Sequence, residues 1–167
     1  MIYVKLPSTR AKPAIPSRSE PHIYISKDMI DKIFERFPEG CSSHIPLMLG
    51  YKCGLRLGEA FGVMWSDIDF IKCTLTINRQ VQWQGGSKEH GKGYWYFSEP
   101  KYNSFRTISL DNSLMELLKR EKQRQERAAE YYADNYTHLY EADNSRALNT
   151  DNRGVEIYPI CRRENGE

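Results

Sequence analysis

The sequence lacks the features that would place it in a zinc-binding, redox or membrane class. Its four cysteines are far apart and none belongs to a C-x-x-C pair, so neither a zinc site nor a redox couple is predicted from them. No apolar run approaches the roughly 18 residues that a bilayer span requires. Met1–Pro7 also lacks the apolar core of a secretory signal. We therefore expect a cytoplasmic protein with free thiols and no membrane partner.

The net charge of the chain is also small. Its 24 Lys and Arg residues and 22 Asp and Glu residues leave a formal charge of +2 at pH 7. This balance excludes a histone-like polycation and an acidic disordered tail. The charge is nevertheless polarised, because residues 1–27 are mostly basic and residues 130–167 are mostly acidic. A chain with one basic end favours a polyanionic partner.

A chain of 167 residues, of which 40% are hydrophobic, is large enough for one domain with a buried core. Residues 1–24 do not belong to that core, because they hold four of the eight prolines among Ser, Lys and Arg. Such a composition resists helix formation and favours an extended linker. We predict a basic, proline-rich linker over residues 1–24 and a folded domain over residues 25–167.

Apolar residues that recur at intervals of three and four predict four helices. Ser26 can cap the first helix, which should end before Pro38. Asp111 or Asn112 begins the long fourth helix, whose far half alternates basic and acidic residues and is expected to be a solvated charged face. The other two helices are expected over residues 44–54 and 57–64.

Period-two alternation indicates β structure between the third and fourth helices. We expect three or four strands in one antiparallel meander, with turns near residues 85–93 and 100–104. Residues 135–153 are polar and predict a loop, and residues 155–160 predict a last short strand. The fold class is therefore α+β, mainly helical with a small antiparallel sheet.

One glycine-rich segment resembles a phosphate-binding loop. Residues 86–92 fit the pattern G-x-x-x-x-G-K, but the next residue is Gly93, which offers no hydroxyl group to a magnesium ion. The segment also precedes the aromatic, strand-like residues 94–97, whereas a phosphate-binding loop must lead into a helix. A hairpin turn explains the segment better than a nucleotide site. Lys88 and Lys92 in this turn are candidates for contacts with DNA phosphates, although ordinary solvated loop charge is the simpler interpretation.

The most specific motif surrounds Arg56. Residues 54–60 read G-L-R-L-G-E-A, and W-S-D-I-D follows over residues 65–69. A guanidinium at the start of a helix, beside free backbone N–H groups, can bind an anion, and Glu59 is placed to orient it. The same residues also fit an ordinary surface ion pair three residues apart, which is common. The residues alone favour this second interpretation.

The motif resembles the first arginine box of the tyrosine recombinases, the phage and transposon integrase family, whose pattern is T-G-x-R-x-G-E followed by W-x-D-I. Residues 100–110, P-K-Y-N-S-F-R-T-I-S-L, resemble the second pattern of that family, P-K-T-x-x-S-x-R-x-I-x-L. The departures are Lys52-Cys53 and Tyr102, where the family prefers Thr. The resemblance extends from about residue 24 onward and implies part of a recombinase catalytic core.

The resemblance implies roles for individual residues. Arg56 would hold a non-bridging oxygen of the scissile DNA phosphate, and Lys101 would donate a proton to the departing 5′ oxygen. Glu59 and Asp67 would support them by orienting Arg56 and closing the helix junction. Candidates for weaker DNA contacts are a set of basic residues in the sheet, the hairpin turn and the linker: Arg106, Lys88, Lys92, Lys12 and Arg18. The alternative for Arg106 is that it only covers the sheet.

The family also needs an H-x-x-R box and a tyrosine nucleophile. None of the four histidines is followed by Arg three residues later, and the tyrosines from Tyr131 to Tyr158 are expected to be packing residues. We therefore expect no nucleophile in this chain, which would be the first part of an integrase catalytic domain and unable to cleave DNA alone. An N-terminal DNA-binding domain would precede the linker. The alternative is a non-catalytic DNA-binding relative.

The resemblance also implies partners. The expected substrate is double-stranded DNA that bears attachment sites. The expected assembly is a homo-tetramer on DNA, with an accessory directionality factor as a further partner. No metal or nucleotide cofactor is expected, because the reaction proceeds through a covalent 3′-phosphotyrosine link.

We predict that the chain does not bind nucleoside triphosphates. Titration calorimetry with ATP and GTP in the presence of magnesium should detect no heat of binding, because the 86–92 segment lacks the hydroxyl ligand and the helix of a phosphate-binding loop. Binding that disappears in a Lys92→Ala variant would instead support a nucleotide-using enzyme.

Overall fold

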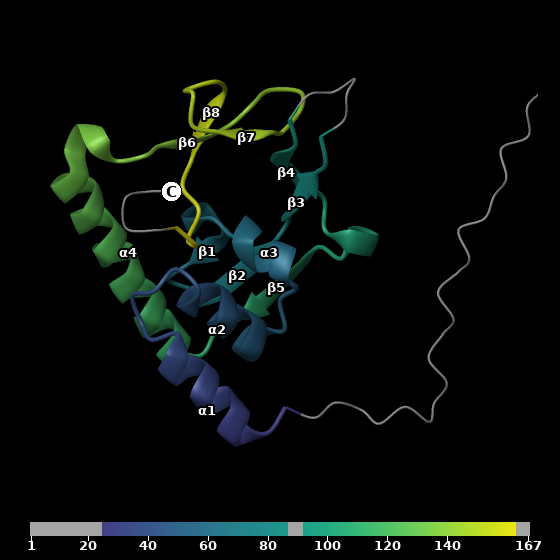
Figure 1. The fold of residues 1–167 in the computed structure, drawn as a ribbon. Coiled ribbons are helices and arrows are strands. Elements are labelled where there is room, and N and C mark those ends of the chain that lie inside the picture. The colour runs from purple at the N-terminus through teal and green to yellow at the C-terminus, as the bar shows by residue number, and fades with distance from the viewer. Residues whose placement is uncertain (1–24, 87–91, 163–167) are drawn as a thin grey trace, which may run out of the picture.

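A computed structural model of the protein describes residues 25–86 and 92–162, and within them it contains four α helices and several short antiparallel strands. The mixed α+β class that the sequence predicts is confirmed. Figure 1 shows the long helix α4 (Asn112–Tyr132) along one side of the molecule and α1 (Lys27–Arg36) at one end. In the middle lie two helices and three strands: α2 (His44–Cys53), α3 (Leu57–Gly62), β1 (Ile68–Asp69), β2 (Thr74–Ile77) and β5 (Arg106–Ser109). Three further strands lie at the opposite end from α1: β6 (Leu139–Glu141), β7 (Leu148–Asn149) and β8 (Val155–Ile157). The predicted linker, with Lys12 and Arg18, lies outside the described residues, as does Lys88.

The helices begin at the residues that the sequence indicates, but the third, which is expected over residues 57–64, ends at Gly62. The side chain of Ser26 accepts a hydrogen bond of 3.3 Å from the backbone N–H of Met29, and the Asp111 carboxylate accepts one of 2.7 Å from Leu114. Gly54 ends the second helix in the left-handed conformation, with φ +64°, which glycine adopts without steric cost. The four helices are α1 (Lys27–Arg36), α2 (His44–Cys53), α3 (Leu57–Gly62) and α4 (Asn112–Tyr132).

The strands pair differently from the predicted meander. Strand β2 (Thr74–Ile77) lies between β1 (Ile68–Asp69) and β5 (Arg106–Ser109), while β3 (Gln80–Gln84) and β4 (Tyr94–Ser98) form a separate hairpin. The prediction that these strands follow one another in one sheet is therefore wrong. Alternation identifies a strand and its buried face but does not identify its partner, which depends on long-range packing.

A third sheet occupies the region that was predicted to be a loop. Strand β6 (Leu139–Glu141) lies between β7 (Leu148–Asn149) and β8 (Val155–Ile157), and all pairs are antiparallel. The loop prediction for residues 135–153 is thus wrong in part, because strands of two or three residues are too short to show a period. The predicted strand at residues 155–160 is present but ends at Ile157.

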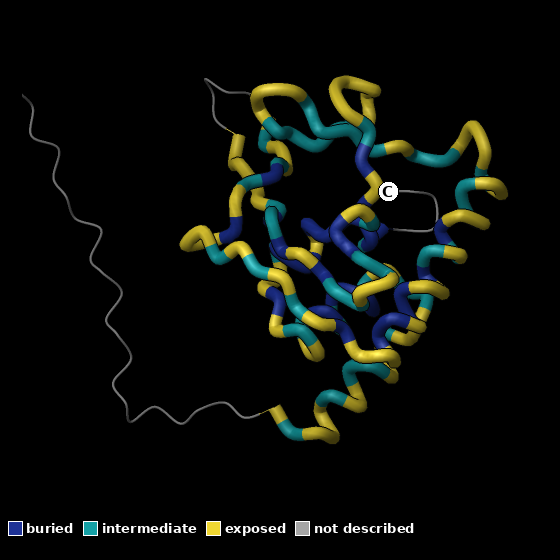
Figure 2. Tube along the Cα trace, turned by 180° about the vertical axis from the view of Figure 1, so that it is seen from behind, coloured by how far each residue is buried: buried dark blue, intermediate teal, exposed yellow. Residues whose placement is uncertain are grey.

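The core lies between α4 and the central layer of helices and strands. Leu49, Leu75, Leu118 and Ile160 are completely buried, and they come from α2, β2, α4 and the segment after β8. Figure 2 shows that the buried segments gather in the interior. In contrast, α1 contains no buried residue. The core thus joins segments from nearly the whole described chain.

Helix α4 is less solvated than its charge pattern predicts. Glu121 and Gln125, in its far half, are 5% and 8% exposed. The Gln125 side chain donates a hydrogen bond of 2.6 Å to the backbone carbonyl of Ile160 and accepts one of 3.0 Å from the indole N–H of Trp65. The expected solvated face is therefore interrupted by a polar contact that attaches the C-terminal segment to the helix.

Two tyrosines also differ from their predicted packing role, because Tyr131 and Tyr158 are 83% and 55% exposed. Among the residues that the structure describes, no helix is both long enough and apolar enough to cross a membrane.

We predict that Gly58→Ala destabilises the fold by about 1–3 kcal/mol, the usual cost of overpacking. A Cβ atom at Gly58 would lie 2.7 Å from the backbone carbonyl oxygen of Val81, because α3 packs directly on β3. Urea denaturation checks this value. Gly85→Ala is the matched control, since a Cβ atom there meets nothing within 4 Å. Equal stability of the two variants would contradict the predicted clash.

Candidate anion-binding site

Arg56 is the N-cap residue of helix α3. It precedes the helix in an extended conformation, and its backbone N–H donates a hydrogen bond of 3.0 Å to the carboxylate of Glu59. Its guanidinium Nη1 donates a second bond of 2.9 Å to the same carboxylate. The Arg56 side chain is 49% exposed, whereas the Glu59 side chain is 0% exposed. The buried acid therefore fixes both the backbone and the side chain of an accessible arginine.

Arg106, which lies 47 residues after Glu59 in the sequence, contacts the same carboxylate. Its Nη2 lies 2.7 Å from Glu59 Oε2 and its Nη1 lies 3.2 Å from Oε1. Arg106, on strand β5, therefore makes a bidentate contact with Glu59. One carboxylate thus stands between two guanidinium groups, and this Arg56–Glu59–Arg106 cluster carries a net charge of +1. An excess positive charge at a partly exposed position is suited to bind an anion.

Ser104 joins the turn before β5 to both arginines. Its hydroxyl accepts a hydrogen bond of 3.1 Å from Arg56 Nη1, and its backbone carbonyl accepts one of 3.1 Å from Arg106 Nη1. These contacts bring the two sequence motifs together at one place, although Arg56 and Ser104 are 48 residues apart. The surface ion pair that the residues alone favoured is present, but it is part of a larger and partly buried network.

The environment of Glu59 keeps it ionised. Burial by itself would raise the pKa of this carboxyl group, but hydrogen bonds from Arg106, from the Arg56 backbone and from the Arg56 side chain outweigh burial and lower the pKa to about 2. The same pairing raises the pKa of Arg106. The cluster therefore keeps its charges across the neutral pH range.

Lys101 lies in the turn between β4 and β5. It begins the 3-10 turn Lys101–Asn103, it is exposed, and its Nζ lies 5.2 Å from the centroid of the Tyr102 ring. Within the described part of the chain, no hydrogen bond or ion pair links Lys101 to Arg56. What connects them is the backbone, because Ser104, which contacts Arg56, follows Lys101 by three residues.

Asp67 stabilises the segment that follows α3 through its hydrogen bonds. Its carboxylate accepts a hydrogen bond of 2.8 Å from the backbone N–H of Met64 and one of 3.2 Å from Asn78, and it pairs closely with Arg79. Of the two residues that were predicted to support the site, Glu59 contacts Arg56 and Asp67 closes the junction. The partner role of Arg79 was not predicted, since no spacing in the sequence relates it to Asp67.

The remaining predicted site residues do not all meet at the cluster. Arg106 does belong to it, and the S-x-R spacing of Ser104 and Arg106 is the signal that could have indicated this. Lys92 is an exposed residue just before β4, in the hairpin. Among residues 25–86 and 92–162, no group of three or more His, Cys, Asp or Glu side chains is suited to hold a metal ion.

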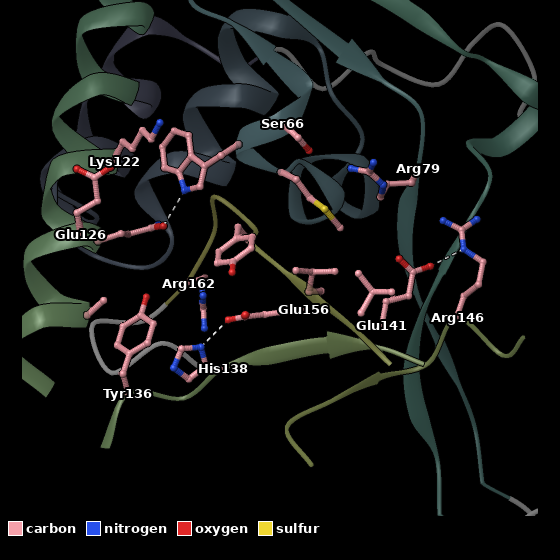
Figure 3. A pocket seen from close by; sticks show the side chains of 17 residues that line it. Ser66, Arg79, Lys122, Glu126, Tyr136, His138, Glu141, Arg146, Glu156 and Arg162 are labelled. Atoms are coloured by element: carbon pink, nitrogen blue, oxygen red, sulfur yellow. Dashed lines mark hydrogen bonds and ion pairs between the residues drawn. The ribbon is translucent and has the colours of Figure 1, made fainter. Parts of the chain in front are cut away.

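A separate cleft of about 610 Å³ lies between α4 and strands β6 and β8 (Figure 3). His138 Nδ1 lies 2.5 Å from Glu156 Oε1, and Arg146 Nε lies 2.7 Å from Glu141 Oε1. The Arg162 guanidinium lies 5.0 Å from the centroid of the Tyr136 ring. The cleft is lined by 17 residues that include neither Arg56 nor Lys101. The two motifs therefore meet outside this cleft.

Comparison with known proteins identifies relatives of part of this chain. No family model matches it. A XerC-like tyrosine recombinase from Caldanaerobacter subterraneus subsp. tengcongensis is 33% identical over 128 residues, which cover 72% of this chain and 33% of that protein. The ICEBs1 integrase of Bacillus subtilis is 32% identical over 79 residues, which cover 47% of this chain and 20% of the integrase. The chain thus spans a third or less of the length of these relatives.

Solved structures of the Tn1549 transposon integrase are also similar. One, in complex with a circular intermediate DNA, is 18% identical with a TM-score of 0.49 and covers 91% of this chain and 41% of that chain. Another, in complex with transposon right end DNA, is 22% identical with a TM-score of 0.46 and covers 66% of this chain and 35% of that chain.

We predict that Glu59 stabilises the fold above about pH 4.5. Its pKa falls from an ordinary value of 4.5 to about 2 in the folded protein, so this contribution is lost as the pH drops from 4.5 to 2. The full shift corresponds to at most about 3 kcal/mol. Urea denaturation of the native chain and of Glu59→Gln should give stabilities that differ most at pH 7 and converge toward pH 2. A difference that does not depend on pH would contradict this role.

Proposed function

Since this chain belongs to the tyrosine recombinase family, we propose that it is part of the catalytic domain of a site-specific DNA recombinase and that the Arg56–Glu59–Arg106 cluster binds the scissile phosphate. In the proposed reaction, a tyrosine oxygen attacks phosphorus, the bond from phosphorus to the 5′ oxygen breaks, and a 3′-phosphotyrosine link forms. Rejoining reverses these steps. The nucleophile would not come from the residues of this chain.

The distribution of contacts favours Arg56 as the phosphate ligand. Both of its side-chain hydrogen bonds use Nη1, so within the described residues Nη2 and Nε donate no hydrogen bond to the protein. A guanidinium has five N–H donors in a planar fork that matches a phosphate. Arg106 uses both terminal nitrogens on Glu59 and Ser104 and is less exposed, at 30%. We therefore assign Arg56 to the phosphate and Arg106 mainly to positioning.

Lys101 is proposed as the general acid. Its exposed ammonium lies on the turn whose far end, Ser104, contacts Arg56. A negative charge develops on the 5′ oxygen as it leaves phosphorus, and an ammonium group is a competent proton donor to it. The fixed guanidinium of Arg56 would stabilise the charge on the non-bridging oxygens in the same step.

The proposed substrate is duplex DNA that bears attachment sites, and the proposed assembly is a homo-tetramer on that DNA, aided by an accessory directionality factor. No metal or nucleotide is required by this chemistry. The observation that carries the proposal is the pairing of Glu59 with both arginines, which brings the two family motifs to one place. The second candidate, a non-catalytic DNA-binding relative, would use the same cluster without the covalent step.

We predict that Arg56→Ala weakens binding of duplex DNA about tenfold, which corresponds to about 1.4 kcal/mol. It should also lower the slope of log K against log salt by about one, since one phosphate contact is lost. Fluorescence anisotropy over a salt series measures both quantities. Lys72→Ala is the matched control, because Lys72 is 78% exposed and, among the residues that the structure describes, its ammonium pairs only with Asp69. Equal effects of the two variants would exclude a specific role for Arg56.

Formation of a covalent link to DNA distinguishes the recombinase from the non-catalytic DNA-binding relative. With nicked suicide duplexes, the chain alone is expected to form no protein–DNA link that survives denaturing gel electrophoresis. Such a link would show that a nucleophile is present and would overturn the expected catalytic incompleteness.

A further inference from the structure

Tyr102 stands at the tip of the turn that carries Lys101, and its placement is unusual. Its side chain is 83% exposed. Its backbone is left-handed, with φ 62° and ψ 28°, and Asn103 follows with φ 50°. An exposed aromatic ring contributes little to the core, and the left-handed region is disfavoured for a residue with a bulky side chain. Packing therefore does not account for Tyr102.

The turn is held at both ends, so this conformation is imposed by its surroundings. Pro100 is fully buried, and its carbonyl accepts a hydrogen bond of 3.0 Å from the backbone N–H of Asn103. At the other end, Ser104 contacts Arg56 and Arg106. Residues in sparsely populated backbone regions persist where the structure around them determines them, and they concentrate at functional sites.

The ring of Tyr102 lies against the ammonium of Lys101. The ammonium lies 5.2 Å from the ring centroid, within the range of a cation–π interaction. An ammonium has three N–H donors, and a ring on one side leaves donors for a phosphate on another. The ring and a DNA phosphate can therefore hold the ammonium at the same time.

We propose that Tyr102 is a positioning residue for Lys101, whose ammonium its ring holds in place for the DNA phosphate. This inference rests on the proposed function of the site. A lysine side chain loses conformational freedom when it binds a ligand. A ring that already restricts the ammonium reduces that loss and so strengthens binding. The recombinase pattern prefers Thr at this position, and a Thr side chain has no ring to offer.

The test is a double-mutant cycle on duplex DNA binding, measured by fluorescence anisotropy at fixed salt. Tyr102→Leu should weaken binding about two- to fivefold, the size expected of an exposed cation–π contact. Tyr102→Phe keeps the ring and should bind within about 1.5-fold of the native chain, a margin well below that loss. In a Lys101→Ala background, Tyr102→Leu should have no further effect, because the group that the ring positions is gone.

A second readout and a second variant guard against misfolding. In the native chain and in Tyr102→Phe, ring currents should shift the ε-methylene protons of Lys101 upfield in NMR spectra, and Tyr102→Leu should lose the shift. Tyr102→Asn also removes the ring, and Asn tolerates the left-handed backbone. It should therefore weaken DNA binding as Tyr102→Leu does.

Three outcomes would overturn the proposal. Native-like binding by both ring-less variants would show that the ring does not matter. An equal loss with and without Lys101 would mean that the ring contacts DNA directly. Absence of the upfield shift would show that the Tyr102 ring does not contact the Lys101 side chain. Failure of the proposed function is recognised separately, because the native chain would then bind duplex DNA weakly and Arg56→Ala would have no effect, whatever the NMR shift shows.

Discussion

The buried carboxylate of Glu59 is the interaction on which the site depends. It binds the backbone and side chain of Arg56 at the start of α3 and the guanidinium of Arg106 on β5. A buried carboxylate without partners would be costly, whereas two guanidinium groups keep it charged and fix its position. Because the two arginines come from different motifs, this one carboxylate links the start of α3 to strand β5.

The site also depends on packing far from it. Helix α3 rests on β3 through Gly58, and the segment after α3 is held by the C-terminal residues, where Ile160 donates a hydrogen bond of 3.0 Å to the carbonyl of Val63. Gln125 on α4 binds the Ile160 carbonyl in turn. The proposed phosphate role of Arg56 requires a fixed guanidinium, and these contacts hold α3 from three parts of the chain.

Accessibility differs among the charged groups, and this difference separates their proposed roles. Glu59 is fully buried, Arg106 is partly exposed, and Arg56 is half exposed. Lys101 and Tyr102 are exposed on a turn whose two ends are fixed. The most buried group, Glu59, therefore positions the arginines, and the more exposed groups are the ones proposed to contact DNA.

Local patterns in the sequence were enough for the α+β class, for caps such as Ser26, Gly54 and Asp111, and for the two motifs, because helix ends and strand alternation depend on near neighbours. The pairing of β2 with β5, the sheet at β6–β8 and the sharing of Glu59 by Arg106 were decided only by the tertiary structure. Each joins residues far apart in the chain, and no periodicity encodes which distant segment a strand or a charge will meet.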